Sequence, residues 1–260
     1  MSAVMSEAKP TALEADPEIG VMLDAGVHLG HARSKRHPAM TPYLWGVRAN
    51  VEIIDLTKTK EKLGEALAFL RELARGGKLV LFVATRPAAR DLVAKLAADL
   101  GYPAAIERWI GGTLTNFRVI SKRIETLDEL ERAAAAGEFA KYTKREQVRK
   151  AAELERLHRG FGSLRLLRRI PDALVIFDLS VETTALREAR RLGIPVVALA
   201  DTNTDPRLVA YPIPANDDAR PAVAYILERM RQAVREGQEE ASAAQEAVPV
   251  PPEPLGERPQ

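Results

Sequence analysis

Short apolar runs alternate with amphipathic stretches along most of the sequence, and this alternation limits the fold more than any other feature. The apolar runs span residues 51–56, 79–84, 104–106, 173–178 and 196–200. Runs that are apolar on both faces are typical of strands covered on both sides, as in parallel sheets. The stretches between them, such as 57–75, 86–100 and 181–192, carry leucines at helical spacing. Repeated strand–helix units predict a doubly wound α/β sheet with right-handed crossovers.

One interval, 113–160, interrupts the alternation. It has no strand signal, but two runs with apolar residues every three or four positions flank the segment AAAAGEF at 133–139. This spacing predicts two helices. We interpret them as an antiparallel helical hairpin that projects from the sheet with basic exposed faces. A helical cap packed on the domain is the alternative.

The two ends of the chain differ from its centre. Residues 1–18 are polar and unpatterned, and residues 236–260 are rich in Glu, Ala and Pro. Such segments have little to bury and are typical of mobile tails. The predicted organisation is a tail at 1–18, an α/β domain at 19–112 and 161–235, the hairpin at 113–160 and an acidic tail at 236–260. We expect the last helix to end near Arg235.

Composition excludes several classes of protein. Hydrophobic residues make up 46% and charged residues 28% of the 260 positions, as in globular chains. No apolar run approaches the roughly 18 residues that span a bilayer, and the first residues lack the apolar core of a secretion signal. We therefore expect a protein that neither spans a membrane nor is secreted, and that has no membrane partner. The absence of cysteine excludes disulfides, thiolate metal sites and cysteine nucleophiles.

Charge is unevenly distributed although the formal net charge is only +2. Residues 141–169 contain ten Lys and Arg against three Glu, whereas residues 236–260 contain six Glu against one Arg. Residues 25–51 contain four Lys and Arg and three of the four histidines, with no acid. Local basic stripes on a nearly neutral chain favour contact with a polyanion at chosen places. A solvated helix face is the alternative for any single stripe.

The segment GVHLGHARSKRH at 26–37 is the densest set of candidate binding residues. His28 and His31, three apart, could share one helix face and hold a metal, but without a nearby acid or cysteine this signal is weak. Phosphate contact suits the neighbouring cations better, because arginine offers a forked pair of donors and lysine a mobile charge. A neutral histidine can also hydrogen-bond a phosphate or a 2′-hydroxyl.

The segment RWIGGTLTNF at 108–117 resembles an anion cradle. Two glycines followed by Thr113, Thr115 and Asn116 at a helix start would offer free amides, hydroxyls and the helix dipole to a phosphate. The Walker and dinucleotide fingerprints are absent. Trp109 could either stack on a base or anchor the hairpin in the core.

A third candidate segment, DTNTDP at 201–206, follows a predicted strand at its carboxyl end, where open α/β sheets bind ligands. Asp201 and Asp205 could hold Mg²⁺ or act as an acid–base pair. The alternative is a turn with a helix cap before Pro206. No Ser/His/acid triad is apparent, so the case for an enzyme is thin.

Six ordered blocks make the chain resemble a known family. They are LDAGVHLGH, PYLWGVRANVEIIDLTKT, RWIGGTLTNF, PDALVIFD, EARRLGIPVVALADTNTDP and YPIPANDDA. Together they are similar to bacterial ribosomal protein S2 of the small subunit, from about Ile19 to Arg235. The resemblance implies a flavodoxin-like, five-stranded parallel sheet with a protruding helical hairpin.

The same resemblance implies a non-enzymatic component of the 30S subunit, on its solvent side where head meets body. It would contact small-subunit rRNA and neighbouring ribosomal proteins, help seat the large RNA-binding ribosomal protein S-one, and support translation. No small-molecule substrate and no cofactor are implied, with a structural Mg²⁺ at Asp201 and Asp205 as the one candidate. The residues that we expect at the RNA interface are His28, His31, Arg33, Lys35, Arg36, His37, Arg48, Arg108, Trp109, Gly111, Gly112, Thr113, Thr115, Asn116, Arg118, Lys122, Arg123, Lys144, Arg168 and Arg169.

The chain departs from the family pattern at three places. Ala39 and Thr41 stand where the family has lysines, while Lys35, Arg36 and His37 are additional basic residues. Arg168 and Arg169 replace family glycines before PDAL. Residues 181–184 lack a histidine that the family often has there.

Two functions of other classes remain as alternatives. One is a phosphosugar or nucleotide enzyme that uses GGTLTN as a cradle and Asp201 with Asp205 as an acid–base pair. The other is an oligomeric scaffold whose basic arm binds acidic proteins.

Overall fold

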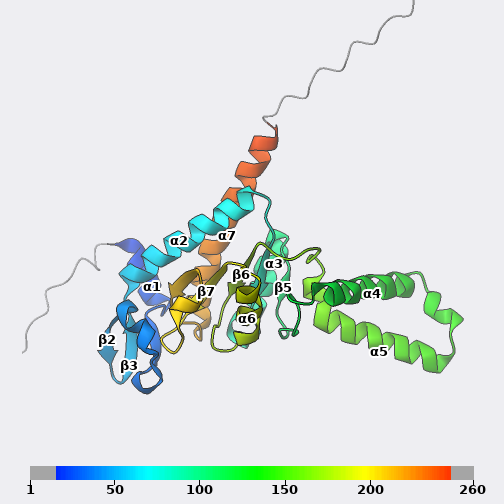
Figure 1. The fold of residues 1–260 in the computed structure, drawn as a ribbon, viewed down its shortest axis with the longest axis horizontal. Helices are drawn as coiled ribbons and strands as arrows, with labels where there is room; N and C mark the ends of the chain where they lie inside the picture. The colour runs from blue at the N-terminus through cyan, green and yellow to red at the C-terminus, as the bar shows by residue number, and fades with distance from the viewer. Residues whose placement is uncertain (1–15, 247–260) are drawn as a thin grey trace, which may run out of the picture.

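The computed structural model describes residues 16–246 and confirms the predicted α/β class. Five parallel strands pair in the order β5-β4-β6-β7-β8. Figure 1 labels β5, β6 and β7 of this sheet. Their bounds are β4 Val80–Val83, β5 Ala104–Ala105, β6 Ala173–Ile176, β7 Val196–Ala200 and β8 Tyr211–Pro214. If only these five parallel strands are numbered, 1 to 5 along the chain, their order in the sheet is 2-1-3-4-5, which is the order of flavodoxin-like folds.

Helices cover both faces of the parallel sheet. The helices α2 (Leu56–Arg75), α3 (Pro87–Leu100) and α7 (Arg220–Glu246) share a buried core with one face, and α6 (Thr183–Arg191) lies on the other. Successive strand residues point to opposite faces. Phe82 and Val175 accordingly belong to the first core, and Leu81 and Leu174 to the second.

Local sequence signals explain where these helices begin and end. The Asp55 carboxylate caps α2 by accepting a 3.0 Å hydrogen bond from the Thr57 amide. Pro87 occupies the first turn of α3, where a missing amide hydrogen costs nothing. Gly101 ends α3 in the left-handed conformation with φ of 72°, which favours glycine.

A second, antiparallel sheet corrects the prediction for residues 51–56. The strand β3 (Val51–Ile54) pairs with β1 (Leu29–Ala32) and β2 (Leu44–Arg48), and does not join the parallel sheet. Residues Ala49 and Asn50 have positive φ and form the tight turn between β2 and β3, which dictates antiparallel pairing. The fifth parallel strand is instead β8, which lies at the sheet edge, where its two prolines are tolerated.

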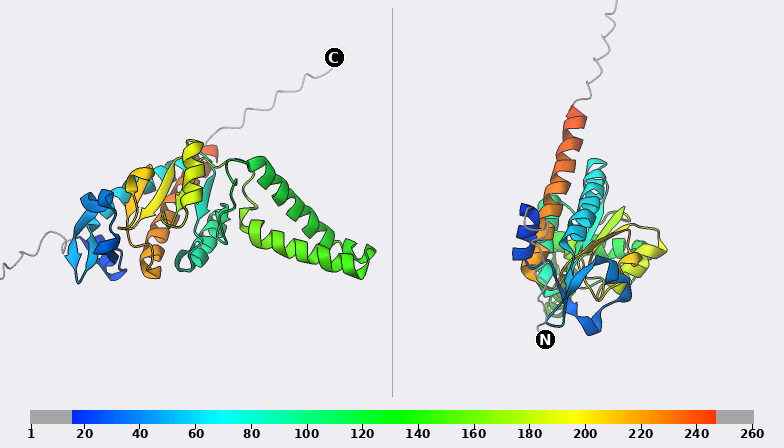
Figure 2. Two further views of the ribbon diagram at one scale, coloured as in Figure 1. Left: turned by 60° about the horizontal axis from the view of Figure 1, so that its bottom comes forward. Right: turned by 90° about the vertical axis from the view of Figure 1, so that its left-hand side faces the viewer.

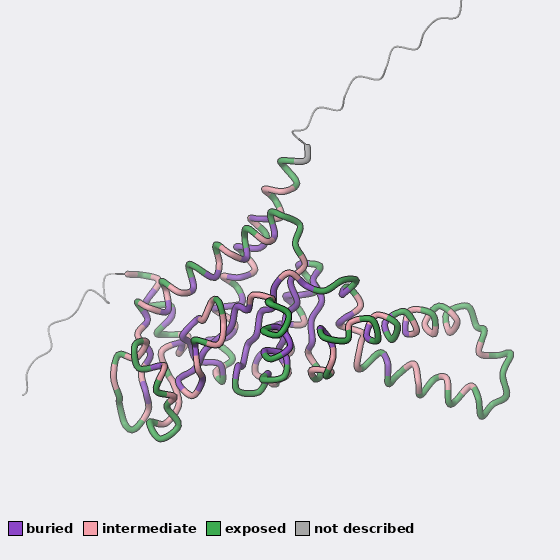
Figure 3. Tube along the Cα trace, in the orientation of Figure 1, coloured by how far each residue is buried: buried purple, intermediate pink, exposed green. Residues whose placement is uncertain are grey.

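Two helices form an arm that projects from the sheet domain (Figure 2). They are α4 (Phe117–Ala135) and α5 (Lys144–Phe161), joined through the 3-10 turn η4 (Glu138–Lys141). The base of the arm is packed through Ile120, Ile124, Leu127 and Leu157. From 128 to 156, a stretch that the structure describes throughout, no residue is buried (Figure 3).

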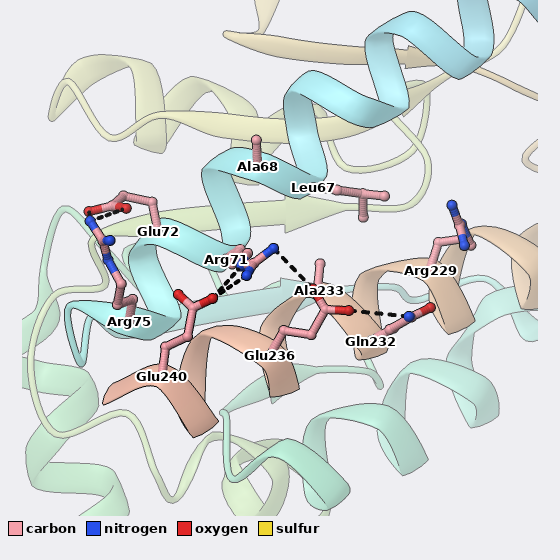
Figure 4. A pocket seen from close by; sticks show the side chains of 10 residues that line it. All are labelled: Leu67, Ala68, Arg71, Glu72, Arg75, Arg229, Gln232, Ala233, Glu236 and Glu240. Atoms are coloured by element: carbon pink, nitrogen blue, oxygen red, sulfur yellow. Dashed lines mark hydrogen bonds and ion pairs between the residues drawn. The ribbon is translucent and has the colours of Figure 1, made fainter. Parts of the chain in front are cut away.

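Part of each predicted tail is helical, at the end that adjoins the α/β domain. The helix α1 (Pro17–Asp24) starts within the segment predicted as a tail, and α7 continues to Glu246, well beyond Arg235. Ion pairs with α2 accompany the longer helix, since Arg71 pairs with Glu236, at 3.2 Å, and with Glu240 (Figure 4). These side chains line a cavity of about 520 Å³ between α2 and α7. The remaining predicted tail residues, 1–15 and 247–260, lie outside the described residues.

Candidate nucleic-acid interface

The basic segment 28–37 is docked on the carboxyl end of β7. The His31 amide donates to Thr202 Oγ1 at 2.8 Å, and the His37 amide donates to the Thr202 carbonyl at 2.8 Å. A side chain at Gly30 would place Cβ 2.3 Å from Thr202 Cγ2, so this close approach requires glycine. Between these anchors, the 3-10 turn η2 (Arg33–Lys35) carries its side chains exposed to solvent.

His28 and His31 lie in and next to a strand, so the prediction that they share a helix face is wrong. Their odd separation directs them to opposite sides of β1. His28 lines an apolar cavity, and burial lowers its pKa. His31 Nδ1 lies 3.2 Å from Asp201 Oδ1 and its Nε2 lies 3.4 Å from Asp218 Oδ2. The interaction with Asp201 raises the pKa of His31, and its side chain is only 13% exposed.

Arg36 differs from its two basic neighbours because it has an internal partner. Its Nη1 lies 3.5 Å from Glu52 Oε1, and the Glu52 side chain is 1% exposed. A buried carboxylate needs a compensating charge. Arg36 therefore supports the antiparallel sheet, while Arg33 and Lys35 remain available for an external anion.

Arg86 fills the crevice at the carboxyl ends of the strands, where flavodoxin-like sheets bind ligands between β4 and β6. Its Nε lies 2.6 Å from Asp178 Oδ2, and its Nη1 contacts Asp218 and lies 3.6 Å from Asp217 Oδ1. Burial and the neighbouring carboxylates, Asp201 first among them, raise the pKa of Asp217 to about 9. The crevice is occupied by the ion pairs of Arg86 with Asp178 and Asp218.

Asp201 and Asp205 use their carboxylates separately, unlike the predicted pair. Asp201 is buried and accepts from the backbone amides of Thr202 and Asp217. Asp205 caps η6 (Pro206–Leu208) and binds the Arg207 guanidinium through both oxygens at 2.9 Å, which lowers the pKa of Asp205 to about 2. The turn-and-cap alternative therefore describes this segment. Within residues 16–246, no group of three or more His, Asp or Glu side chains is arranged to hold a metal ion.

The GGTLTN segment forms an anion cradle, and its anion is the carboxylate of Glu188. Glu188 Oε1 accepts from Trp109 Nε1 at 3.0 Å and from the Gly112 amide at 2.8 Å. Glu188 Oε2 accepts from the amides of Leu114 at 3.0 Å and Thr115 at 3.1 Å, and from the Thr115 hydroxyl at 3.1 Å. Most of the donors that we predicted for a phosphate are thus already bonded within the chain, namely the amides of Gly112 and Thr115 and the hydroxyls of Thr113 and Thr115.

Hydrogen bonds have a larger effect on the pKa of Glu188 than burial has. Burial alone would raise the pKa of Glu188, but the bonds from Trp109 and three amides lower it below its ordinary value. Trp109 also packs against the core on the α6 face, which favours the anchoring interpretation of this residue. Thr113 is buried and donates to the Ile110 carbonyl, whereas Gly111 and Asn116 are exposed.

The remaining predicted cations lie on the surface. Arg118, Lys122, Arg123 and Lys144 are exposed on the two arm helices, and Arg108 is exposed at the base of the arm. At the junction of arm and sheet, Arg168 lies 3.3 Å from Asp128 and Arg169 lies 2.7 Å from Asp172, with 61% and 52% of their side chains exposed.

Sequence reasoning missed two features of this surface. The first is Glu188; its position among Ala185, Leu186 and Ala189 on the buried side of α6 was the available signal. The second is Trp45, which is 67% exposed beside Arg48. Trp45 lines an apolar cavity of about 290 Å³ together with His28 and residues of β1 and β3.

No helix within the described part of the chain could cross a membrane.

Comparison with known proteins agrees with this architecture. The family profile described as Ribosomal protein S2 matches residues 22–237. Relatives that carry the name small ribosomal subunit protein uS2 include three from different bacteria. The protein of Thermus thermophilus is 47% identical, and the match covers 80% of this chain and 81% of the relative. The protein of Amoebophilus asiaticus is 46% identical, with 83% of this chain and 69% of the relative covered. The protein of Porphyromonas gingivalis is 43% identical, with 85% of this chain and 79% of the relative covered. The chain therefore belongs to the ribosomal protein S2 family, whose members are structural, non-enzymatic components of the small ribosomal subunit.

Proposed function

We propose that this protein binds small-subunit rRNA on the solvent side of the 30S subunit, where head meets body. The observation that carries the proposal is the docked basic segment. Its backbone is anchored at Thr202 on both sides, and it presents Arg33 and Lys35 to solvent. As a ribosome component, the protein would work in the cytoplasm and support translation.

The chemistry of the segment suits RNA in its folded form. Structured RNA is recognised largely through phosphates and 2′-hydroxyls, which need positioned cations and no base code. A rigid backbone lowers the entropy that is lost when these side chains bind. The crevice that would hold a small molecule in this fold is filled by Arg86 and its carboxylates.

We further propose that the protein helps to seat ribosomal protein S-one. A protein neighbour needs exposed apolar surface, and Trp45, Val47 and Leu29 expose 67%, 43% and 42% of their area. The cavity of about 290 Å³ beside Trp45 offers room for an apolar side chain. Replacing Trp45 with Ser should lower the amount of S-one on purified subunits while this protein remains bound to them.

Substitution of the two free cations tests rRNA binding. The variant Arg33→Gln/Lys35→Gln should bind small-subunit rRNA more weakly, and the slope of log affinity against log salt should become shallower by about 0.7 to 0.9 for each phosphate that the variant no longer neutralises. Arg36 is left intact because its loss would leave the buried Glu52 carboxylate without a compensating charge.

The matched control removes two exposed arginines of α6 instead, as Arg190→Gln/Arg191→Gln. It should bind as the wild type does. Equal affinity of the first variant and the wild type, measured with folded protein, would remove this segment from the interface. A wild-type chain that fails to bind small-subunit rRNA at all would overturn the proposed function.

A further inference from the structure

A row of arginines follows one side of α5. Arg145, Arg149, Arg156 and Arg159 are separated by four, seven and three residues. At about 100° per residue they fall within an arc of about 80°, and the row extends about 21 Å along the helix axis. Ala152 is the other residue near the centre of this arc. All four arginines are exposed, Arg156 to 74% and Arg159 to 67%. We call these four side chains the arginine row.

The arginine row points away from the protein's own core. By the same helical geometry, Leu154 and the buried Leu157 lie on the opposite side of α5. The helix α5 runs beside α4 and contacts it within the arm (Figure 1), and this pairing can bury the apolar side that carries Leu157. The arginines therefore do not serve the packing of the hairpin.

At its carboxyl end the arginine row meets Arg108, which comes from the segment before α4. The two elements enclose a cavity of about 370 Å³ lined by Glu107, Arg108, Ala152, Glu155, Arg156, Arg159 and Gly160. Ala152 and Gly160 have almost no side chain, so the space between the arginines stays open. Glu155 binds Arg159 at 2.8 Å, while the nearest acid to Arg156, Glu153, is 4.0 Å away. The balance of charge around the cavity is positive.

We propose that the arginine row together with Arg108 binds the phosphate backbone of duplex RNA. The proposal rests on the proposed rRNA function and extends it to a second surface, separate from the segment 28–37. A guanidinium matches a phosphate with two parallel hydrogen bonds, and four of them in line can follow one edge of a groove. No aromatic side chain lies within the arc of the row. Stacking of unpaired bases, which single-stranded RNA would need, is therefore not provided for.

The test uses the full-length chain, transcribed small-subunit rRNA and a salt series. The variant Arg145→Gln/Arg149→Gln/Arg156→Gln/Arg159→Gln should bind about 30-fold or more weakly near 0.1 M salt, with a salt slope shallower by about 3. Glutamine has nearly the helix propensity of arginine, and circular dichroism verifies that the arm remains helical. The matched control, Arg187→Gln/Arg190→Gln/Arg191→Gln/Arg235→Gln, removes the same charge from exposed sites on α6 and α7 and should bind as the wild type does.

A second variant replaces the four arginines with lysine. Lysine keeps the charge and the helix but cannot offer two parallel hydrogen bonds to one phosphate. It should keep most of the salt slope and still bind several-fold more weakly. Three probes identify the ligand class: a 20-base-pair RNA duplex, a single strand of equal length and polyglutamate. Loss of duplex binding in the glutamine variant, with smaller losses on the other two, supports the proposal.

Two outcomes would overturn it. The first is unchanged rRNA and duplex binding by the glutamine variant while Arg33→Gln/Lys35→Gln is impaired, which leaves the proposed function standing without this surface. The second is a loss confined to polyglutamate, which would make the row a site for an acidic protein.

Discussion

Glu188 Oε1 accepts a 3.0 Å hydrogen bond from Trp109 Nε1, and this contact joins α6 of the sheet domain to the segment that begins the arm. The same carboxylate receives the amides of Gly112, Leu114 and Thr115. Hydrogen bonds to an ionised acceptor are stronger than those between neutral groups. One buried acid therefore determines how the base of the arm is held against the sheet.

Replacing Glu188 with Ala should lower the free energy of unfolding by about 3 kcal/mol or more, because an indole and three amides lose their acceptor in a poorly solvated site. Glu188→Gln should cost about 2 kcal/mol, since its amide oxygen can serve only one side of the cradle. Urea unfolding at neutral pH measures both values. Hydrogen exchange of the Gly112, Leu114 and Thr115 amides, which are bonded to Glu188, should be faster in both variants.

The control for this prediction is Glu129→Ala on the exposed side of α4, which should change stability by less than about 0.5 kcal/mol. If Glu188→Ala unfolds at the wild-type urea concentration, the carboxylate does not hold the arm.

The contact between α7 and α2 leads to a second prediction. A Cβ at Gly237 would lie 2.3 Å from the Arg71 carbonyl oxygen and 2.9 Å from Ala74 Cβ. Gly237→Ala should therefore force the helices apart and cost about 1 to 3 kcal/mol by urea unfolding. Gly64→Ala in α2 is the matched control, because nothing lies within 4 Å of its Cβ. That variant should gain about 0.5 to 1 kcal/mol from helix propensity, and a loss of equal size in both would contradict the prediction.

Much of the fold could be predicted because it depends on local periodicity. Apolar runs and leucine spacing located four of the five parallel strands and both arm helices. The strand β8 could not be found in this way, since its sequence YPIP contains two prolines and is tolerated only at an edge. The pairing of residues 51–54 depends on a two-residue turn formed by Ala49 and Asn50. Hairpin turns of this kind usually contain glycine, as in Asn-Gly, so the sequence did not indicate a hairpin here.

The candidate site was predicted in composition but not in its contacts. The GGTLTN cradle was recognised by its amides and hydroxyls, yet nothing local reveals that Glu188, more than 70 positions away, supplies the anion. The same holds for Arg36, which follows the turn η2 and whose partner Glu52 lies in the strand β3. A cation pattern identifies basic segments, whereas tertiary packing decides which cations remain free.

A third prediction separates Arg36 from its neighbours. Arg36→Gln should destabilise the protein by about 1 kcal/mol, because Glu52 would lose the charge that compensates its burial. Adding Glu52→Gln should recover part of this loss, since a neutral amide is cheaper to bury than an unpaired carboxylate. Urea unfolding of both single variants and the double variant gives the coupling energy. Strictly additive losses would mean that the 3.5 Å contact contributes nothing.

Asp217 leads to a prediction about pH. Burial and the carboxylates of Asp201, Asp178 and Asp218 raise its pKa to about 9, and Arg86 opposes this shift only in part. The ordinary value for an aspartate is 3.8. Between about pH 4 and pH 9 the folded chain thus holds a proton at this group that the unfolded chain has released. The group's contribution to stability is largest at low pH and falls as pH rises, by up to about 1.4 kcal/mol per pH unit.

Asp217→Asn resembles the protonated carboxyl and cannot ionise, so it should escape this loss. We expect its free energy of unfolding to exceed that of the wild type at pH 8.5, by a margin that shrinks steadily towards pH 4. Urea unfolding at intervals of one pH unit measures the margin, with Asp91→Asn, whose side chain is 67% exposed, as the control that should show none. A margin that is the same at every pH would mean that the buried carboxyl does not titrate in this range, because only a difference in bound protons between the folded and unfolded chains can make stability depend on pH.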